Sequence, residues 1–302
     1  MKHLKTKFLI LDGNSLACRA AFAHNPHFGP DLHTSYGKPT GATLRFLNMF
    51  DRILHQFKPT HILVAWDVSR ETFRNVLDEN YKANREPRSD NDLKIFFQDI
   101  KHILTEIGCK NVGVLGYEGD DIVGTYSVLS KADKTFIVSG DKDSFQLVNN
   151  KVSVIFPKNG FKEVEIITPQ YIQDTYGISV DKFTDLKALM GDGGDNISGI
   201  SGCGEKTAIK LLQHYGSADA VANNFDNIDL KGINKTVIAG IKEWAPRSYV
   251  VKQLVTIRKD VEVPYTFDQC KINLKWENAR EIFKELELNS LVRKLNGAEF
   301  YG

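Results

Sequence analysis

Aspartate and glutamate residues follow each of four short apolar segments in the first half of the sequence. These carboxylates are Asp12, Asp67, Glu118, Asp120, Asp121, Asp141 and Asp143. A single Asp beside a Gly is usually a turn or helix-capping residue. Carboxylates gathered at one edge, however, repel one another unless bound cations neutralise them or their pKa values shift. We therefore treat this set as a candidate metal site.

The chemistry of these side chains favours a hard cation. Carboxylate oxygens without accompanying His or Cys suit Mg2+ or Mn2+ better than Zn2+. Because Mg2+ keeps several waters and binds few carboxylates directly, so large a set indicates two ions. Sites with two ions about 3.5–4 Å apart are associated with phosphoryl chemistry. The residues thus predict a metal-dependent enzyme acting on a phosphate ester, and they leave open whether the substrate is a polymer or a small molecule.

A glycine-rich stretch later in the sequence adds two more carboxylates, Asp192 and Asp195. The residues that follow, 199–208, read Gly-Ile-Ser-Gly-Cys-Gly-Glu-Lys-Thr-Ala and suit a tight turn between two helices. The N-terminus of the second helix presents backbone N–H groups, and together with Lys206 it would attract a backbone phosphate. A Gly-x-Gly alone is weak, but its position beside Asp192 and Asp195 makes it more specific.

Charge is unevenly distributed, although the formal net charge is only +1. Residues 1–60 carry eight Lys or Arg against three Asp, whereas residues 111–200 carry eight Lys against thirteen acidic residues. A basic region suits a polyanion, and a concentrated acidic region suits cations. Solvated surface charge explains many such imbalances, so the position of the acidic residues decides the interpretation.

The elements that must position the carboxylates are typical of an α/β fold. Segments that are apolar throughout, as buried parallel strands are, occur at Phe8–Leu11, Ile62–Ala65, Val112–Leu115 and Phe136–Val138. Helical patterns lie between them, and the clearest runs from Leu93 to Ile107 and is ended by Gly108. This alternation predicts a mostly parallel central sheet flanked by helices. Ligands of such sheets bind beyond the carboxyl ends of the strands, where these acidic residues lie.

The chain beyond about residue 168 is predicted to be helical. Before it, Val152–Phe156 and Val164–Ile167 form a predicted hairpin around Asn159-Gly160. The predicted helices are Gln170–Tyr176, Asp181–Met190, Lys206–Tyr215, Lys235–Arg258 with an interruption at Pro246, and Glu277–Leu286. We therefore divide the chain into an α/β core, residues 1–168, and an α-helical subdomain, residues 169–302.

Residues 68–92 fit neither pattern. Acidic residues and few large aliphatic side chains accompany a basic set: Arg70, Arg74, Lys82, Arg85 and Arg88. Connections between a strand and a helix usually take two to six residues, so this segment is too long for a simple connection. Long loops of this kind are usually functional or disordered, and we favour function.

Composition and cysteine usage exclude several protein classes. The chain is 42% apolar and 25% charged, as is usual for globular proteins. No apolar run is long enough to span a bilayer, and Asp12 cuts short the N-terminal apolar stretch that a signal peptide would need. The four cysteines are scattered, which excludes an ordinary zinc site and indicates no disulfide framework. We expect a cytoplasmic protein with reduced thiols and no membrane association.

Taken together, the motifs resemble the 5′-nuclease family: the N-terminal nuclease domain of bacterial DNA polymerase I, stand-alone bacterial 5′-3′ exonucleases and phage flap endonucleases. The resemblance runs from about Phe8 to about Tyr215, is weaker beyond, and is closest to the stand-alone exonucleases. Its carriers, in the family's order, are Leu11-Asp12-Gly13, Trp66-Asp67, Tyr81-Lys82-Ala83-Asn84-Arg85, Gly116–Asp121, Ser139–Asp143, Met190–Asn196 and Gly202–Ala208.

The resemblance implies a PIN-like 5′-nuclease fold and a structure-specific 5′ nuclease of DNA replication and repair. Such an enzyme acts on DNA with a 5′ flap, overhang or duplex end and leaves a 5′-phosphate and a 3′-hydroxyl. Tolerance of RNA-primer 5′ ends stays open, and we expect a monomer. Two Mg2+ or Mn2+ ions would be held by two groups of residues: Asp12, Asp67, Glu118, Asp120 and Asp121 in one, some of them through water, and Asp141, Asp143, Asp192 and Asp195 in the other. Some of these ligands would be shared between the two ions, and the sequence leaves open which.

The resemblance also implies roles for basic and aromatic residues. Residues 68–92 match the helical arch that the 5′ strand passes, where Lys82 and Arg85 would add positive charge at the transition state. Tyr81 would either stack on an unpaired base or pack within the arch. Arg19 falls where the family has a basic residue near the scissile phosphate. Residues 196–215 match a helix-hairpin-helix that grips duplex DNA beside a K+ ion, and its contact residues are Gly202, Gly204, Lys206 and Thr207.

Two rival functions are weighed against this one. A catalytically silent DNA-junction protein of the same fold would be favoured by missing carboxylates, yet all of them are present in the sequence. A Mg2+-dependent phosphatase of small molecules also uses acidic strand ends. It would need neither the glycine-rich hairpin nor the long basic segment.

Overall fold

The computed structural model describes residues 6–22, 32–85, 91–158, 163–228, 231–297 and 300–301. Its centre is a sheet with the strand order β3-β2-β1-β4-β5-β6. The strands are β1 (Lys7–Asp12), β2 (His61–Ala65), β3 (Asn111–Val112), β4 (Lys134–Val138), β5 (Val152–Lys158) and β6 (Glu163–Ile167). Neighbouring strands pair in parallel except β5 and β6, which are antiparallel. The predicted mostly parallel sheet is confirmed.

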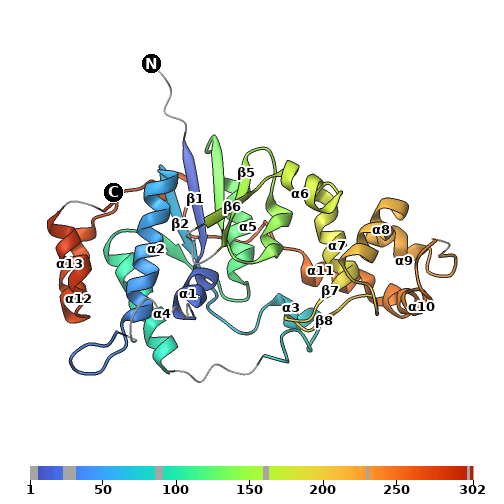
Figure 1. Ribbon diagram of the computed structural model, residues 1–302, viewed down its shortest axis with the longest axis horizontal. Helices are drawn as coiled ribbons and strands as arrows, with labels where there is room; N and C mark the ends of the chain where they lie inside the picture. Colours follow the sequence, from blue (N-terminus) through green and yellow to red (C-terminus); the bar gives the residue numbers. More distant parts are fainter. Residues whose placement is uncertain are drawn as a thin grey trace, which may run out of the picture.

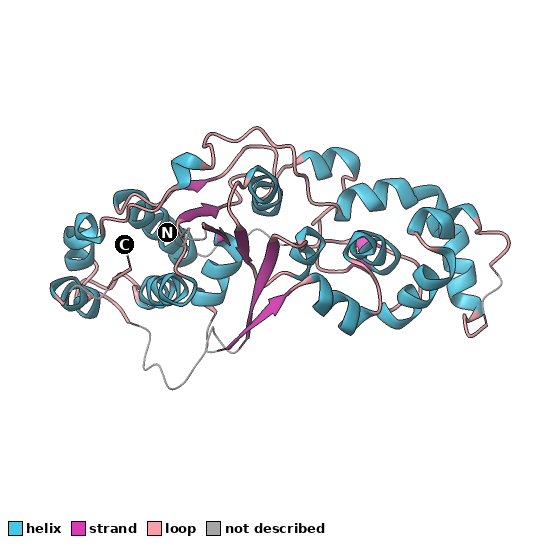
Figure 2. Ribbon diagram, turned by 90° about the horizontal axis from the view of Figure 1, so that it is seen from above, coloured by secondary structure: helices cyan, strands magenta, loops and turns pink. Residues whose placement is uncertain are grey.

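Helices cover both faces of this sheet, as the view from above shows (Figure 2). In β1, Phe8 and Ile10 enter one apolar core, whereas Leu9 and Leu11 enter the other, because successive side chains of a strand point to opposite faces. The flanking helices are α5 (Gly119–Leu129) on the first side, and α1 (Gly13–Ala21), α2 (Gly41–Phe57) and α4 (Asn91–Glu106) on the second. Burial of both faces explains why these strands are continuous apolar runs in the sequence.

The third strand is shorter than its apolar run predicts. Only Asn111 and Val112 pair with β2, and Leu115 is 76% exposed. The chain leaves the sheet at Gly113, where a Cβ atom would lie 2.1 Å from Val68 Cγ1. The predicted strand Val112–Leu115 is therefore wrong beyond its first residue.

The predicted hairpin and the long basic segment are only partly described. β5 and β6 pair as expected, with Val154 opposite Ile167. The predicted turn at Asn159-Gly160 lies outside the described residues, as do residues 86–90 and with them Arg88. The described part of the 68–92 segment contains a short helix, α3 (Phe73–Leu77). Thr72 and Asn75 form a capping box at its N-terminus.

The helical part of the chain extends from one side of the sheet (Figure 1). Its helices are α6 (Pro169–Tyr176), α7 (Phe183–Met190), α8 (Glu205–Tyr215), α9 (Ala218–Asn223), α10 (Lys235–Trp244) and α11 (Ser248–Val255). Between α7 and α8, the antiparallel pair β7 (Gly191–Asp192) and β8 (Ile197–Ser198) encloses a tight loop. Pro246 lies in a 3-10 turn between α10 and α11, as its sequence position suggests, but α11 ends at Val255 rather than Arg258. Every helix within the described ranges is too short or too polar to cross a membrane.

The end of the chain returns to the α/β core. Ile272 N donates to Thr60 O, and Lys275 N donates to Ile107 O, both at 2.9 Å. The helices α12 (Arg280–Glu285) and α13 (Asn289–Asn296) then lie at the opposite end of the molecule from α8 to α10 (Figure 1). Their apolar side chains join the core formed by α2 and α4. The predicted helical subdomain, 169–302, therefore differs from the structure in its last part, because helical periodicity does not reveal which core a helix completes.

Candidate active site

The acidic residues meet where the strand order reverses. β1 lies between β2 and β4: the chain moves outward from β1 to β3 and then returns to β4 on the other side. In open α/β sheets, ligands bind beyond the carboxyl ends of the strands at such a switch point. Asp12 is the last residue of β1, and Asp141 follows β4 closely. The two carboxylates therefore lie at the edge where a ligand is expected.

Asp12 is buried and hydrogen-bonded. It caps α1: its Oδ1 accepts from Ser15 N at 2.9 Å, and its Oδ2 accepts from Ser139 Oγ at 2.8 Å. Burial raises the pKa of Asp12 to about 7, with help from the charges of Asp67 and Asp141 and against these hydrogen bonds. A nearby cation would favour the ionised form and remove this penalty.

Asp67, Glu118 and Asp120 come from the next two strand ends. Asp67 Oδ1 accepts from Gly119 N at 2.6 Å, which ties the end of β2 to the start of α5. Burial and the charges of Asp12 and Asp141 raise the pKa of Asp120 well above its ordinary value. Carboxylates that resist ionisation in this way gain most from a divalent cation.

A lysine that the sequence reading missed joins the second group of carboxylates. Lys187 Nζ, from α7, lies 2.6 Å from Asp143 Oδ1 and 2.8 Å from Asp192 Oδ2. Burial and the charge of Asp141 raise the pKa of Asp143 to about 6 despite Lys187. Burial also opposes the ionisation of Asp192, but Lys187 and backbone N–H groups outweigh it and lower the pKa. The only sequence signal for Lys187 was its position near the end of the predicted helix Asp181–Met190, shortly before Asp192.

The carboxylates surround the switch point without forming a closed cage. Among the residues that the structure describes, no three His, Cys, Asp or Glu side chains are placed to hold a metal ion as they stand. The ammonium groups of Lys82 and Lys187 contact carboxylate oxygens there. Mg2+ takes only one or two carboxylates directly and keeps several waters. An oxygen-only donor set with raised pKa values therefore fits a hydrated hard cation.

The segment after α3 places the two cationic side chains predicted to act in catalysis, those of Lys82 and Arg85, beside the carboxylates. Lys82 Nζ lies 2.7 Å from Glu118 Oε1 and 3.7 Å from Asp195 Oδ2. The φ angle of Lys82 is +55°, in the left-handed region that non-glycine residues seldom adopt, and its N–H donates to Asp195 O at 2.9 Å. Arg85 forms an ion pair with the same Asp195. These contacts hold residues 82–85 between the two groups of carboxylates.

Tyr81 packs inside the protein. Its side chain is 4% exposed, and its hydroxyl lies 3.1 Å from Glu118 Oε2 and 3.0 Å from Asp195 Oδ2. The sequence left open whether Tyr81 stacks on a base or packs within the arch. The structure supports packing, because a ring buried to this extent offers no face to a base.

Asp121 does not join the other carboxylates. It is fully buried, and its two oxygens accept from Arg74 at 2.7 and 2.9 Å. They also accept from the backbone N–H groups of Glu118 and Arg258. These donors occupy the lone pairs that a metal would need. The structure corrects the prediction of Asp121 as a ligand: neighbouring residues on a helix point about 100° apart, so Asp120 and Asp121 face different surroundings.

Arg19 lies beside the loop that follows β4. A Cβ atom on Gly140 would be 2.9 Å from Arg19 Nη2 and 3.0 Å from Ser15 Oγ, so the guanidinium lies directly against this glycine. Burial lowers the pKa of Arg19, but a guanidinium stays charged in proteins. Arg19 thus brings a positive charge next to Gly140, the residue before Asp141.

The glycine-rich turn leads directly into α8, as predicted, but it is preceded by the strand β8 and not by a helix. Gly202 has a φ of +73°, which glycine adopts without strain, and Gly204 caps α8. Lys206 and Thr207 stand in the first turn of α8, and Lys206 is exposed. α10 supports the turn closely: a Cβ atom on Gly240 would lie 2.8 Å from Ser201 N. The helix N-terminus is therefore presented to solvent on a rigid base.

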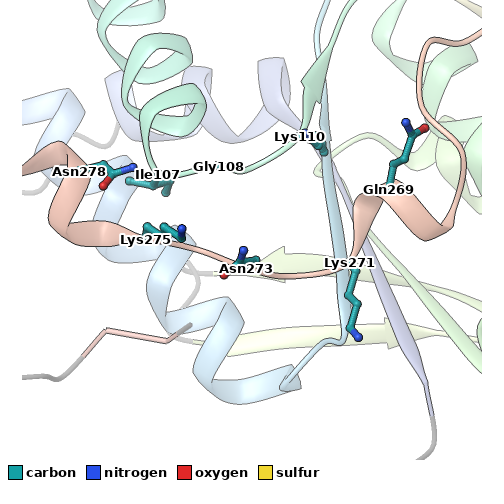
Figure 3. A pocket seen from close by; sticks show the side chains of 8 residues that line it. All are labelled: Ile107, Gly108, Lys110, Gln269, Lys271, Asn273, Lys275 and Asn278. Carbon is teal, nitrogen blue, oxygen red and sulfur yellow. The ribbon is translucent and has the colours of Figure 1, made fainter.

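A shallow polar groove lies at the opposite edge of the sheet, where the C-terminal segment passes the end of α4 (Figure 3). Its polar lining residues are Lys110, Lys271, Lys275, Gln269, Asn273 and Asn278. Lys271 forms a β-bridge with His61, the first residue of β2, so the groove adjoins the starts of the strands and not their ends. Its lysines are therefore remote from the carboxylates.

The chain matches two consecutive family models. One, "5'-3' exonuclease, N-terminal resolvase-like domain", covers residues 7–177, and the other, "5'-3' exonuclease, C-terminal SAM fold", covers residues 178–278. A 5'-3' exonuclease of Bacillus subtilis is 33% identical over 298 residues, which are 97% of this chain and 98% of the relative. DNA polymerase I of Bacillus caldotenax is also 33% identical, over 97% of this chain, but the chain spans only 32% of that relative's length.

Solved structures share the fold. A T5 5'-exonuclease structure with bound zinc ions has a TM-score of 0.66 and 22% identity, over 82% of this chain and 89% of that one. Flap endonuclease-1 from Methanococcus jannaschii also has a TM-score of 0.66, with 16% identity over 97% of this chain and 91% of that one. At these identities the likeness concerns the fold alone, and it confirms the predicted PIN-like α/β fold.

Proposed function

Because the chain belongs to the 5′-3′ exonuclease family, we propose that it is a structure-specific 5′ nuclease that hydrolyses DNA. It acts on a duplex with a 5′ flap, overhang or end, and it leaves a 5′-phosphate and a 3′-hydroxyl. The observation that carries this proposal is the meeting of carboxylates from separate strand ends at the switch point, with Lys82 laid across them. The whole-chain match to a stand-alone exonuclease supports it.

Two hydrated divalent ions, Mg2+ or Mn2+, are proposed as cofactors. Their ligands, direct or through water, are Asp12, Asp67, Glu118 and Asp120 around one position, and Asp141, Asp143, Asp192 and Asp195 around the other. Asp141 borders both positions, because its charge acts on Asp12 and Asp120 as well as on Asp143. The raised pKa values of Asp12, Asp120 and Asp143 support this assignment, because each marks a carboxylate in need of positive charge. When bound, such ions lower the pKa of an attacking water and stabilise charge on the phosphate.

The cationic side chains bind and orient the scissile phosphate. Lys82 exchanges part of its contact with Glu118 for the phosphate oxygens, whose charge grows during the reaction. Arg85, which is more exposed, holds the neighbouring phosphate, and Arg19 approaches from the side of Asp141. A preorganised donor of this kind acts mainly on the transition state, so Lys82 is expected to affect the rate more than binding.

The turn before α8 is the proposed grip on the duplex. Gly202 and Gly204 let the backbone approach a phosphate, and Lys206 and Thr207 add donors at the exposed helix N-terminus. A K+ ion on backbone carbonyls of this turn completes the grip in our proposal. One chain carries both the cutting site and the grip, which is why we propose a monomer.

Cleavage of a 5′-labelled flap duplex tests the function and its rivals. We expect cutting near the junction with Mg2+, none with EDTA, and little on a 3′ flap or on free single strands. Binding without cutting would favour the catalytically silent DNA-binding protein. Hydrolysis of small phosphate esters without action on DNA would favour the phosphatase.

A further inference from the structure

The buried pair of Arg74 and Asp121 joins three parts of the molecule. Arg74 is 3% exposed and belongs to α3, at the start of the segment that leads to Lys82; Asp121 is 0% exposed and belongs to the first turn of α5. The third part is the segment that follows α11, residues 254–258. We propose that this pair is a positioning device that sets Lys82 against Glu118, an inference that rests on the proposed function.

Nearly all the hydrogen-bond donors of the Arg74 guanidinium have partners within the protein. Its Nη1 and Nη2 donate to the two oxygens of Asp121 at 2.7 and 2.9 Å, in the fork geometry that matches a carboxylate. Its Nε donates to Leu254 O at 2.9 Å, and its Nη2 donates to Thr256 O at 3.0 Å. Asp121 in turn accepts from Arg258 N at 2.9 Å. The pair thus fixes α3, α5 and residues 254–258 in one geometry.

The contacts close into a ring that includes the proposed catalytic lysine. Glu118 N donates to Asp121 Oδ2 at 3.1 Å, and the carboxylate of Glu118 receives Lys82 Nζ at 2.7 Å. On the other side, Asn75 follows Arg74 and its Nδ2 donates to Tyr81 O at 3.2 Å, which shortens the path from α3 to Lys82. A displacement of the buried pair therefore changes where the Lys82 ammonium meets Glu118.

Residues 254–258 are braced from a second direction. Gln146, in the turn that follows Asp141, donates from Nε2 to Val255 O at 3.0 Å, and its Oε1 accepts from Ile257 N at 2.9 Å. A Cβ atom on Gly124 of α5 would lie 2.5 Å from Arg258 O, so the segment rests directly on that helix. Residues 254–258 thus connect the Arg74–Asp121 pair both to α5 and to the turn that follows Asp141.

Stability alone is a weak reason for such a pair. Two well-packed apolar residues of similar volume are often as stable as a buried ion pair or more so, whereas loss of one partner is strongly destabilising. A buried ion pair does, however, fix orientation more narrowly than apolar side chains do. An apolar replacement of both partners therefore separates positioning from stability.

The test compares Arg74→Met/Asp121→Leu with a matched control, Lys294→Met/Asp51→Leu, which removes the 2.6 Å ion pair between α13 and α2. We expect both variants to be folded. The Arg74/Asp121 variant should cleave at least ~10-fold more slowly under saturating enzyme, with a DNA Kd within about threefold of the parent and an unchanged Mg2+ midpoint. The control should keep the parental rate. Arg74→Lys keeps the positive charge but cannot form the two parallel hydrogen bonds to Asp121, so it should also slow cleavage while leaving the DNA Kd and the Mg2+ midpoint nearly unchanged. It replaces the double variant in the test if the double variant does not fold.

The route through Lys82 has its own readout. In a protein that already carries Lys82→Ala, the Arg74/Asp121 substitutions should lower the cleavage rate by less than about a further threefold. The reason is that the effects of substitutions at residues acting as one unit are not additive. A full multiplicative loss would overturn the proposed route. A rate within about twofold of the parent would overturn the positioning role itself, and a roughly tenfold shift of the Mg2+ midpoint would instead make Asp121 a ligand.

Failure of the proposed function is distinguishable from failure of this inference. A parent protein that cuts no DNA would refute the nuclease, and the pair would then be judged by hydrogen exchange. The N–H of Lys82 donates to Asp195 O at 2.9 Å and should be protected in the parent. We expect its exchange to quicken at least ~10-fold in the Arg74/Asp121 variant and not in the Lys294/Asp51 control. Equal protection in all three proteins would refute the positioning role.

Discussion

Substitution of Lys82 by Ala removes one charge from the centre of the site and leaves its frame in place. The Lys82 side chain is 24% exposed and lies 2.7 Å from Glu118 Oε1. The backbone contact to Asp195 O uses the N–H of residue 82, which alanine retains. Both residues have a Cβ atom, so the φ of +55° is about as unfavourable for Ala as for Lys. Residues 82–85 should therefore keep their position beside Asp195 without the ammonium.

The expected loss of cleavage rate can be worked out from the attraction between the Lys82 ammonium and the negative charge on the phosphate. Two unit charges about 4 Å apart at an effective dielectric constant of about 20 interact with about 4 kcal/mol. At about 1.4 kcal/mol for each factor of ten, this corresponds to roughly 10³-fold in rate. Part of this interaction energy is not gained during the reaction, because the ammonium already contacts Glu118 in the ground state. We therefore expect Lys82→Ala to lower the rate by ~10²-fold or more, similar to the loss of one preorganised donor.

The assay is a single-turnover measurement with saturating enzyme on a 5′-labelled flap duplex, paired with a binding measurement. Affinity should change little, because other cations also contact the DNA backbone. Lys82→Arg should restore activity only in part, since a planar guanidinium does not occupy the point where the ammonium lies. Lys271→Ala, in the groove at the opposite edge of the sheet, is the control for the loss of one lysine. A Lys82→Ala rate within about threefold of the parent would refute the catalytic role, whatever happened to affinity.

Three further outcomes are expected. Asp141→Asn should nearly abolish cleavage in saturating Mg2+ with flap binding unchanged or slightly tighter, measured by single-turnover kinetics and fluorescence anisotropy; parental cleavage would remove Asp141 from the metal group. Lys206→Ala should weaken DNA binding, flatten the slope of log affinity against log salt by about one unit and leave the saturated rate unchanged, whereas a lower rate at unchanged affinity would contradict the grip. In EDTA, the thermal unfolding midpoint should fall as the pH rises from about 4 to about 7, because Asp12, with a folded pKa of about 7, then binds more protons folded than unfolded. Mg2+ should reduce this fall, and a midpoint that rises over the same range in EDTA would contradict a pKa of Asp12 that burial raises.

Much of the fold and of the site was predictable because the signals act over short distances. A strand buried on both faces requires a continuous apolar run, and the residue after it stands at the carboxyl edge of the sheet. Asp12, Asp67 and Asp141 follow this rule, so their meeting required only the parallel arrangement. The turn at Gly202 and Gly204 was likewise readable, since its backbone angles depend on the residues themselves.

The sequence by itself therefore determined the parallel sheet, the acidic edge and the family to which the chain belongs. The tertiary structure alone decided which of two adjacent aspartates takes part: Asp120 faces the acidic edge, whereas Asp121 turns inward to Arg74. It also placed Lys187 between Asp143 and Asp192 and packed α12 and α13 against α2 and α4. These contacts join residues distant in the chain, and no local pattern encodes them, because a side chain's partner is set by how the helices pack around the sheet.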